Sequence, residues 1–189
     1  ADAVKEITAM YNFVKEFKIT NVVLVGGYDS YLVTDLLKEL DIAVMIRRTH
    51  DLPMRPEDDI DHPYKLPALL SEAGVLFCLE NSGDMEQMNT RNLPFLAGTA
   101  VTYGLDKEEA IAALTLNTAK ILGIDAQCGS IEEGKDATIF VSEGDALDML
   151  TNNVTLAYVQ GRMIELTNHQ IELYEKYDAK YNDSSIENK

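Results

Sequence analysis

The segment from Arg91 to Val141 constrains the fold of this 189-residue chain more than any other part of it. Asp106 stands in an N-cap position with Glu109 three residues later, and Gly123 stands where a helix would end. Between them, apolar residues recur at a helical spacing: Ala110, Ala113, Leu114, Leu116 and Ile121. The pattern predicts one helix over residues 107–122.

In the rest of this segment the helical spacing of apolar residues ends. Residues 129–136 form a polar, Gly-punctuated turn cluster, and Ala137–Val141 is a run of residues that favour strands. A strand therefore begins near residue 137. Few folds use this order of a long helix followed by a short strand hairpin.

Upstream of this segment, short apolar runs alternate with helical patterns. The runs predict three buried strands, at 21–27, 42–46 and 75–79. Helices are expected over 1–17, 31–40 and 66–73, the second capped by Asp29 or Ser30, with a long polar loop over 47–63. The alternation predicts parallel βαβ units with right-handed crossovers.

The C-terminal part has a different pattern. Two β-rich runs around Gly161 predict a hairpin over 154–166, and a terminal helix is expected from Asn168 until it frays near Asn182. Cys78 and Cys128 occur in unrelated contexts without metal-type spacing, so both are expected to be unpaired thiols.

At residues 115–124 (TLNTAKILGI) and 129–141 (GSIEEGKDATIFV) the chain resembles the metal-dependent amidohydrolase superfamily, and within it the imidazolonepropionase-like members. The resemblance implies an α/β fold in which residues 1–122 form the C-terminal strand-helix units of a (β/α)₈ TIM barrel. Residues 123–167 would form part of a small β-sandwich domain, and 168–189 a C-terminal helix and tail. A whole barrel takes about 250 residues, so the resemblance implies a C-terminal fragment of a longer protein.

The resemblance also implies where the chemistry lies. In this superfamily, His residues on the first, fifth and sixth strands and an Asp at the end of the eighth hold one or two metal ions that activate water. The three predicted strands resemble the sixth, seventh and eighth. The sixth-strand end, Val25–Asp29, contains no His, and Ser82 stands where the family has its Asp. We therefore expect no metal ligand and no cofactor in this fragment, with a divalent metal, zinc foremost, in its full-length parent.

Six side chains are candidates for the site, which such barrels place at the carboxyl ends of their strands. Asp84 is the candidate catalytic carboxylate, and Glu80 is a neighbouring acid; the alternative is that both are solvated loop residues. Arg47, His50 and Arg91 are candidates for binding the substrate, and Arg48 could join the two other arginines in binding its carboxylate. The alternatives are surface ion pairs and a loop His bonded to a neighbouring acid.

Composition limits the partners. The chain has 32 acidic against 16 basic side chains, and the basic ones are scattered, so nucleic acid is not an expected partner. No run has the length of a membrane-spanning helix, and no membrane partner is expected. The compartment stays unknown, cytoplasmic or exported, because the true N-terminus is expected to be absent. Open strand edges predict a homo-oligomer or association with the missing N-terminal half.

Two functions from different classes follow. In the first, the chain is the C-terminal portion of an amidohydrolase whose parent hydrolyses non-peptide carbon-nitrogen bonds of a small molecule, cyclic amides foremost, and the fragment is itself inactive. In the alternative, the parent is a degenerate, non-catalytic binding protein of the same fold. A nucleotide-binding reading of residues 22–30 (VVLVGGYDS) is weaker, because the glycines do not form G-x-G-x-x-G.

Overall fold

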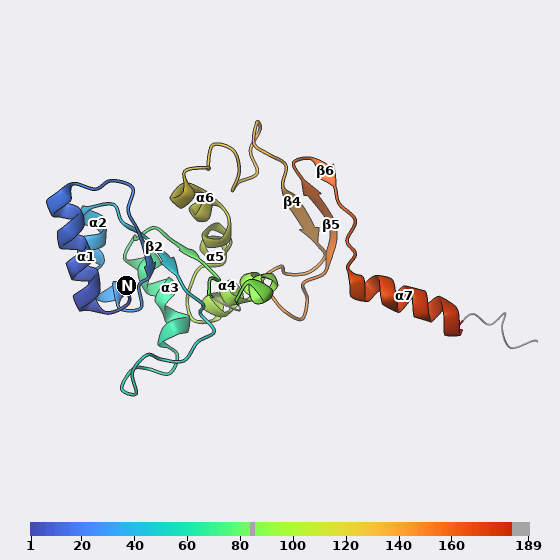
Figure 1. The fold of residues 1–189 in the computed structure, drawn as a ribbon, viewed down its shortest axis with the longest axis horizontal. Coiled ribbons are helices and arrows are strands. Elements are labelled where there is room, and N and C mark those ends of the chain that lie inside the picture. The colour runs from blue at the N-terminus through green and yellow to red at the C-terminus, as the bar shows by residue number, and fades with distance from the viewer. Residues whose placement is uncertain (84–85, 183–189) are drawn as a thin grey trace, which may run out of the picture.

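The structure is a computed structural model that describes residues 1–83 and 86–182, so the candidate Asp84 lies outside the described residues. The elements follow one another along the chain as drawn in Figure 1. Their bounds are α1 (Val4–Phe17), β1 (Val23–Gly26), η1 (Ser30–Leu32), α2 (Thr34–Glu39), β2 (Ala43–Ile46), α3 (His62–Glu72), β3 (Phe77–Leu79), η2 (Glu86–Asn92), α4 (Leu93–Thr102), α5 (Lys107–Leu114), α6 (Leu116–Leu122), β4 (Ile139–Ser142), β5 (Val154–Val159), β6 (Arg162–Met163) and α7 (His169–Asn182).

The three predicted strands form one parallel sheet in the order β1-β2-β3, which confirms the strand-helix alternation. Val44 pairs with both Leu24 and Phe77, so these three side chains share one face, and all are almost fully buried. They join one hydrophobic cluster with residues of the connecting helices. The continuous apolar runs predict burial of both faces of the sheet, but Val25, on the opposite face of β1, is 40% exposed.

Helix α1 covers part of this face with a stripe of Ile7, Tyr11 and Val14, all buried. The sequence shows no capping residue ahead of it. In the structure, the Glu6 carboxylate accepts the backbone N–H groups of Asp2 and Ala3, at 3.0 and 3.3 Å. The acid three residues into the helix thus satisfies donors that would otherwise lack partners.

Helix α3 begins at His62, four residues before the predicted start, and the preceding loop is correspondingly shorter. Pro63 lies in the first turn, where a missing N–H costs nothing, and Pro67 lies inside the helix. The prediction places Pro63 in the loop, so the predicted helix starts too late. The predicted helix over 31–40 is also shorter, because it opens as the 3₁₀ turn η1 and becomes α-helical only at Thr34.

The predicted single helix over 107–122 is wrong, because the chain forms two helices that meet at Thr115. Thr115 has φ −125° and ψ −88°, outside the helical region, and its Oγ1 donates to the Ile111 carbonyl at 2.8 Å. The caps were predicted correctly: Asp106 accepts two backbone N–H groups, and Gly123 ends α6 with φ +69°. A break between two good caps leaves the apolar spacing almost unchanged, so the period does not reveal it.

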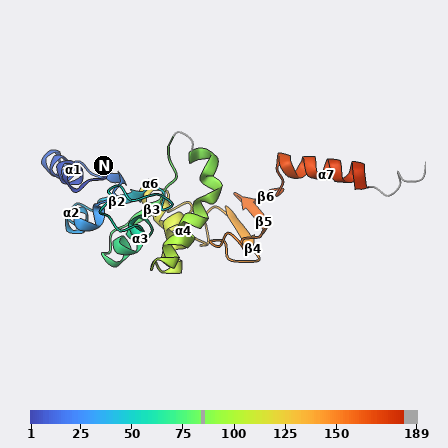
Figure 2. The same cartoon turned by 90° about the horizontal axis from the view of Figure 1, so that it is seen from below.

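The C-terminal strands form a separate antiparallel sheet in the order β4-β5-β6, which confirms the predicted hairpin. Several of its apolar side chains are exposed, among them Phe140, Leu156 and Met163. Helix α7 extends away from this sheet in both views (Figures 1 and 2). The C-terminal part of the described chain contains this one sheet, and a sandwich requires two. The β-sandwich and the domain boundaries at residues 122 and 167 therefore stay predictions. Within residues 1–83 and 86–182, no helix is long and apolar enough to cross a bilayer.

Candidate functional site

The carboxyl ends of β1, β2 and β3 meet at one edge of the parallel sheet, and a cavity of about 230 Å³ opens there. Charged and polar groups gather at this edge because each strand ends in a polar loop. The cavity is lined by Asp2, Gly26, Tyr28, Ile46, Arg47, Arg48, Asp51, Leu52, Met54, Pro63 and Leu66. Clefts at the carboxyl ends of parallel strands are where α/β proteins place their reactive groups.

The end of β1 is occupied by the start of the chain. The Ala1 amino group donates to the Val25 carbonyl at 2.9 Å, and Gly27 N–H donates to the Ala1 carbonyl at 2.8 Å. Gly26 has φ +100°, and the Asp2 carboxylate fills the space that a side chain at Gly26 would need. This carboxylate accepts a hydrogen bond from Tyr28 N–H at 3.4 Å. A glycine at 26 is therefore what lets Asp2 reach the cavity.

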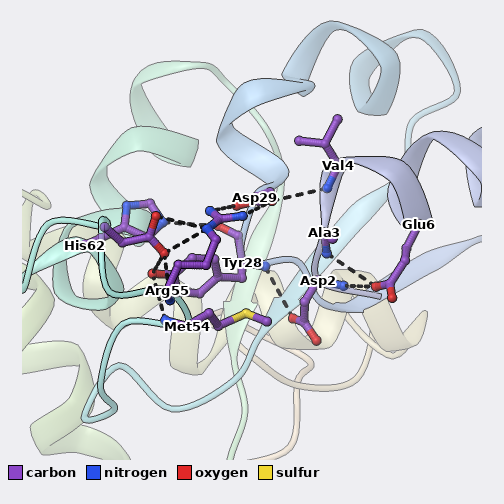
Figure 3. Close-up of polar contacts among 10 residues, drawn as sticks. Asp2, Ala3, Val4, Glu6, Tyr28, Asp29, Met54, Arg55 and His62 are labelled. Carbon is purple, nitrogen blue, oxygen red and sulfur yellow. Dashed lines mark hydrogen bonds and ion pairs between the residues drawn. The ribbon is translucent and has the colours of Figure 1, made fainter.

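Arg55 ties the loop between β2 and α3 to the end of β1 (Figure 3). Its guanidinium donates to both oxygens of Asp29, at 2.6 and 3.0 Å, while its Nε donates to Asp58 at 3.0 Å. The Tyr28 hydroxyl donates to Asp58 at 2.9 Å and accepts Met54 N–H at 3.2 Å. The loop that supplies half of the cavity wall is thus held by charge-assisted hydrogen bonds.

Asp29 is not the helix cap predicted for it. No side-chain cap bond is made at η1 or α2, and the Asp29 carboxylate, which is almost fully buried, accepts Val4 N–H of α1 and binds Arg55 instead. The hydrogen bonds from Arg55 lower the pKa of Asp29, and those from both acids raise the pKa of Arg55. The pKa of Asp58 is lowered as well, so Asp29, Asp58 and Arg55 all stay charged at neutral pH.

His62, interpreted from sequence as structural, supports the same corner. Its ring is buried between Tyr28 and Tyr31, with ring centroids 4.6 and 4.8 Å away, and its Nε2 lies 3.2 Å from the Tyr28 carbonyl. Burial also raises the pKa of the Tyr28 phenol, so its hydroxyl stays protonated and able to donate to Asp58.

Arg47, a predicted substrate-binding residue, lines the cavity. Its Nε lies 3.9 Å from Oε1 of Glu80, beyond hydrogen-bond distance, and its side chain is mostly exposed. Arg48 lines the cavity too, with its guanidinium 3.7 Å from Asp51. Arg47 is therefore held far more loosely than Arg55.

The other two predicted substrate-binding residues lie apart from this cavity. His50 Nε2 is 2.5 Å from the Thr99 hydroxyl on α4, and partial burial there lowers the pKa of His50. Arg91 lies near the end of η2 with an exposed side chain. Neither is among the described residues that line the cavity, and their substrate-binding roles stay predictions.

The end of β3 carries Glu80 and Ser82. Glu80 N–H donates to the Ile46 carbonyl at 2.9 Å, which extends the β2–β3 pairing, and its Oε1 is buried without a hydrogen bond in the described part of the chain. Cys78 and Cys128 are free thiols, as predicted, and burial raises the pKa of Cys78.

The described residues of this chain do not by themselves fit a metal ion. Among the described residues, no group of three or more His, Cys, Asp or Glu side chains could hold one. The last residue of β1 is Gly26, and Asp2 fills the space that a ligand side chain at this position would occupy.

A second cavity, of about 350 Å³, lies between α4 and the loop at 145–149. Lys107 and Asp145 form an ion pair at its side, 2.7 Å apart. It is larger than the strand-end cavity, but no strand end and no predicted site residue contributes to it. The smaller cavity is therefore the better candidate for chemistry.

The sequence interpretation missed Asp2, Tyr28, Arg55 and Asp58. One local signal was present: Arg55 and Asp58 are three residues apart, a spacing that favours an ion pair within a turn. The partnership of Arg55 with Asp29 joins residues 26 positions apart and leaves no such signal.

Residues 21–164 match the Amidohydrolase family, so the chain belongs to this family. An imidazolonepropionase from Thermoplasma volcanium is 35% identical over 88 residues, which are 46% of this chain and 21% of that protein. An imidazolonepropionase from Shouchella clausii is 34% identical over 83 residues, 43% of this chain and 19% of that protein. Both support the resemblance to imidazolonepropionase-like members.

Among solved structures, an amidohydrolase from Thermotoga maritima superposes with a TM-score of 0.70 at 29% identity. The match covers 87% of this chain and 42% of the Thermotoga protein. The chain thus spans less than half of that structure, and the curated matches span about a fifth of the imidazolonepropionases. Amidohydrolases are hydrolases that generally depend on a metal.

Proposed function

We propose that this chain supplies the last three strands of a (β/α)₈ barrel and part of a β-sandwich to an amidohydrolase that hydrolyses the carbon-nitrogen bond of a cyclic amide. The observation that carries the proposal is the cavity at the shared carboxyl end of β1, β2 and β3, which gathers Arg47, Arg48 and Asp2. Family membership and the imidazolonepropionase relatives support the reaction class.

The roles follow from the side chains at the cavity. Arg47 and Arg48 would hold a carboxylate, or the negative oxygen that develops when water adds to an amide carbon. The apolar wall of Leu52, Met54 and Leu66 would exclude water from the rest of the ligand. No metal-binding group is present in the described residues, so the chain alone is proposed to be inactive.

The experiment compares this chain with the product of the complete gene that carries it. Both are incubated with five- and six-membered cyclic amides, and ring opening is followed by the primary amine or carboxylate released. We expect turnover by the longer protein, loss of at least tenfold in its Arg47→Gln variant, and none by this chain alone. Turnover of linear peptides but not cyclic amides, or full activity of Arg47→Gln, would contradict the proposal.

A second candidate is a non-catalytic, amidohydrolase-like binding protein. It is favoured by Gly26 and Ser82, which stand at two strand ends where the family places catalytic side chains. Under this alternative, the longer protein binds cyclic amides in a calorimeter and releases no product. A His-x-His pair in the sequence that would form its first barrel strand favours the enzyme instead.

We also propose that the chain associates with itself or with the remaining half of the barrel. Its apolar side chains on the second sheet and on α7 are exposed, including Met163 and Tyr181. Surfaces of this kind are normally covered by a partner. Light scattering at several concentrations tests the self-association, and a monomer at all of them leaves only the other half as partner.

A further inference from the structure

The strand-end cavity presents charges of both signs. Asp2 reaches it along β1, while Arg47 and Arg48 enter from the end of the neighbouring β2. A second acid, Asp51, also lines the cavity and lies 3.7 Å from Arg48. The remaining lining is mostly apolar and includes Ile46, Leu52, Met54, Pro63 and Leu66. A pocket with both acids and guanidinium groups on a largely apolar lining is complementary to a ligand with two opposite charges on a short hydrocarbon body.

The hydrogen bonds show which charged groups can take a ligand. Arg55 is fully engaged, with oxygens of Asp29 and Asp58 at 2.6 to 3.0 Å. In contrast, Arg47 lies 3.9 Å from its nearest acid, outside hydrogen-bond distance. A ligand carboxylate at a normal charge-assisted distance of about 2.8 Å would be a closer partner than Glu80. Arg47 is therefore the guanidinium of the cavity that can turn to a ligand without giving up a strong bond.

The Asp2 carboxylate can likewise bind a ligand without giving up a strong hydrogen bond. Its Oδ1 accepts one hydrogen bond, from Tyr28 N–H, at a long 3.4 Å. An ionised carboxylate has about four lone-pair sites, so this one retains acceptor capacity toward the cavity. A ligand ammonium would make a stronger, charge-assisted bond there.

Resting on the proposed function, we infer that this cavity binds the zwitterionic, ring-opened product of cyclic amide hydrolysis. In that reaction the ring carbon-nitrogen bond breaks, and the oxygen of water joins the acyl carbon to give a carboxylate. The nitrogen keeps the bonding electron pair and takes up the two protons of that water, so it becomes an ammonium group at the other end of the same molecule. A neutral substrate thus gains two opposite charges, with Arg47 positioned for the carboxylate and Asp2 for the ammonium.

The volume sets the size of this product. At about 30 Å³ per water-sized group, 230 Å³ holds about eight non-hydrogen atoms. The ring-opened form of a six-membered cyclic amide, 5-aminopentanoate, has this size. Larger products would extend out of the cavity.

Binding to this chain is measured by titration calorimetry with four probes of similar size: 5-aminopentanoate, pentanoate, pentylamine and the uncharged ring 2-piperidone. We expect 5-aminopentanoate to bind at least fivefold more tightly than each of the others. Equal affinity for all four probes would overturn the inference. So would the absence of any binding of 5-aminopentanoate when its concentration reaches about 10 mM, about 50 times that of the protein.

Variants then assign the two charges. Arg47→Gln should weaken the binding of 5-aminopentanoate and pentanoate at least fivefold and leave the binding of pentylamine unchanged. Asp2→Asn should weaken the binding of 5-aminopentanoate and pentylamine at least fivefold and leave the binding of pentanoate unchanged. Arg162→Gln on β6 and Asp35→Asn on α2 are matched controls on exposed sites, which should change nothing. Equal losses in the controls, or loss of all probes in both cavity variants with unchanged circular dichroism, would contradict the assignment.

The outcome is separable from that of the proposed function. Turnover of cyclic amides by the longer protein without preferential binding of 5-aminopentanoate overturns this inference alone. Preferential binding without turnover overturns the proposed hydrolysis and leaves the cavity as a binding site for zwitterions.

Discussion

Replacing Asp29 by Ala should destabilise the chain by about 3 kcal/mol. The Asp29 carboxylate is 3% exposed, but Arg55, which binds it, is 39% exposed. Breaking their pair should therefore cost more than breaking an exposed pair, which costs up to about 1 kcal/mol, and less than breaking a buried one, which costs about 3–5 kcal/mol. We take a loss of about 2 kcal/mol of unfolding free energy. The variant also leaves Val4 N–H without its acceptor, which costs about 1 kcal/mol more.

The assay is urea unfolding followed by circular dichroism. With a denaturant slope of about 2 kcal/mol per M, the midpoint should fall by about 1.5 M. Asp29→Asn keeps an acceptor oxygen and should fall between the wild type and Asp29→Ala. Asp35→Asn, on an exposed site where the carboxylate lies 3.5 Å from Lys38, is the matched control and should leave the midpoint within error.

The pairing itself is tested by combining Asp29→Ala with Arg55→Ala. Arg55→Ala also removes the bond to Asp58, so the double variant should lose more than Asp29→Ala alone. If Asp29 and Arg55 act as a pair, its loss should nevertheless be smaller than the sum of the two single losses. A loss below about 1 kcal/mol for Asp29→Ala, or strictly additive losses in the double variant, would refute the view that Asp29 and Arg55 together anchor the loop.

Three further predictions concern pH, packing and metal. Because hydrogen bonds from Arg55 lower the pKa of Asp29, its stabilisation is complete above the unfolded pKa of about 3.9 and is lost as the pH falls through the lower folded value. Urea midpoints at pH 5 and pH 3 should therefore differ more for the wild type than for Asp29→Asn. Replacing Phe77 on β3, which is 1% exposed, by Ala should lower the free energy of unfolding by about 3–5 kcal/mol, measured by thermal unfolding. A loss under about 1 kcal/mol would mean that the surrounding side chains close the cavity. After equilibration with excess zinc and removal of free metal, the chain should retain well under one zinc per molecule by elemental analysis, and tight stoichiometric binding would contradict the absence of a metal site in its described residues.

The strands were predictable because their signal is local and strong. Each is a run of buried apolar residues, and the alternation with helices fixes parallel pairing before any contact is known. Asp106 and Gly123 were predictable for the same reason, since a cap acts on its immediate neighbours. The break at Thr115 was not, because it depends on one backbone conformation that the apolar spacing does not reflect.

The site was predictable only in its position. The predicted strand ends correctly locate the cavity and include Arg47, which lines it. His50 instead forms a hydrogen bond with Thr99 on α4 and does not line the cavity. Asp29 illustrates the cause: next to a helix start it reads as a cap, while its actual partner, Arg55, arrives from a distant loop. Side-chain direction and long-range pairing are tertiary properties, and spacing along the chain does not encode them.

The contact between Asp2 and Gly26 has an evolutionary consequence. Any side chain at position 26 would collide with the carboxylate from position 2, and the backbone there already has a φ that favours glycine. Relatives that carry a larger residue at the end of this strand must therefore place the residue equivalent to Asp2 elsewhere. The two positions should covary across the family, so that an acid at the first accompanies glycine at the second.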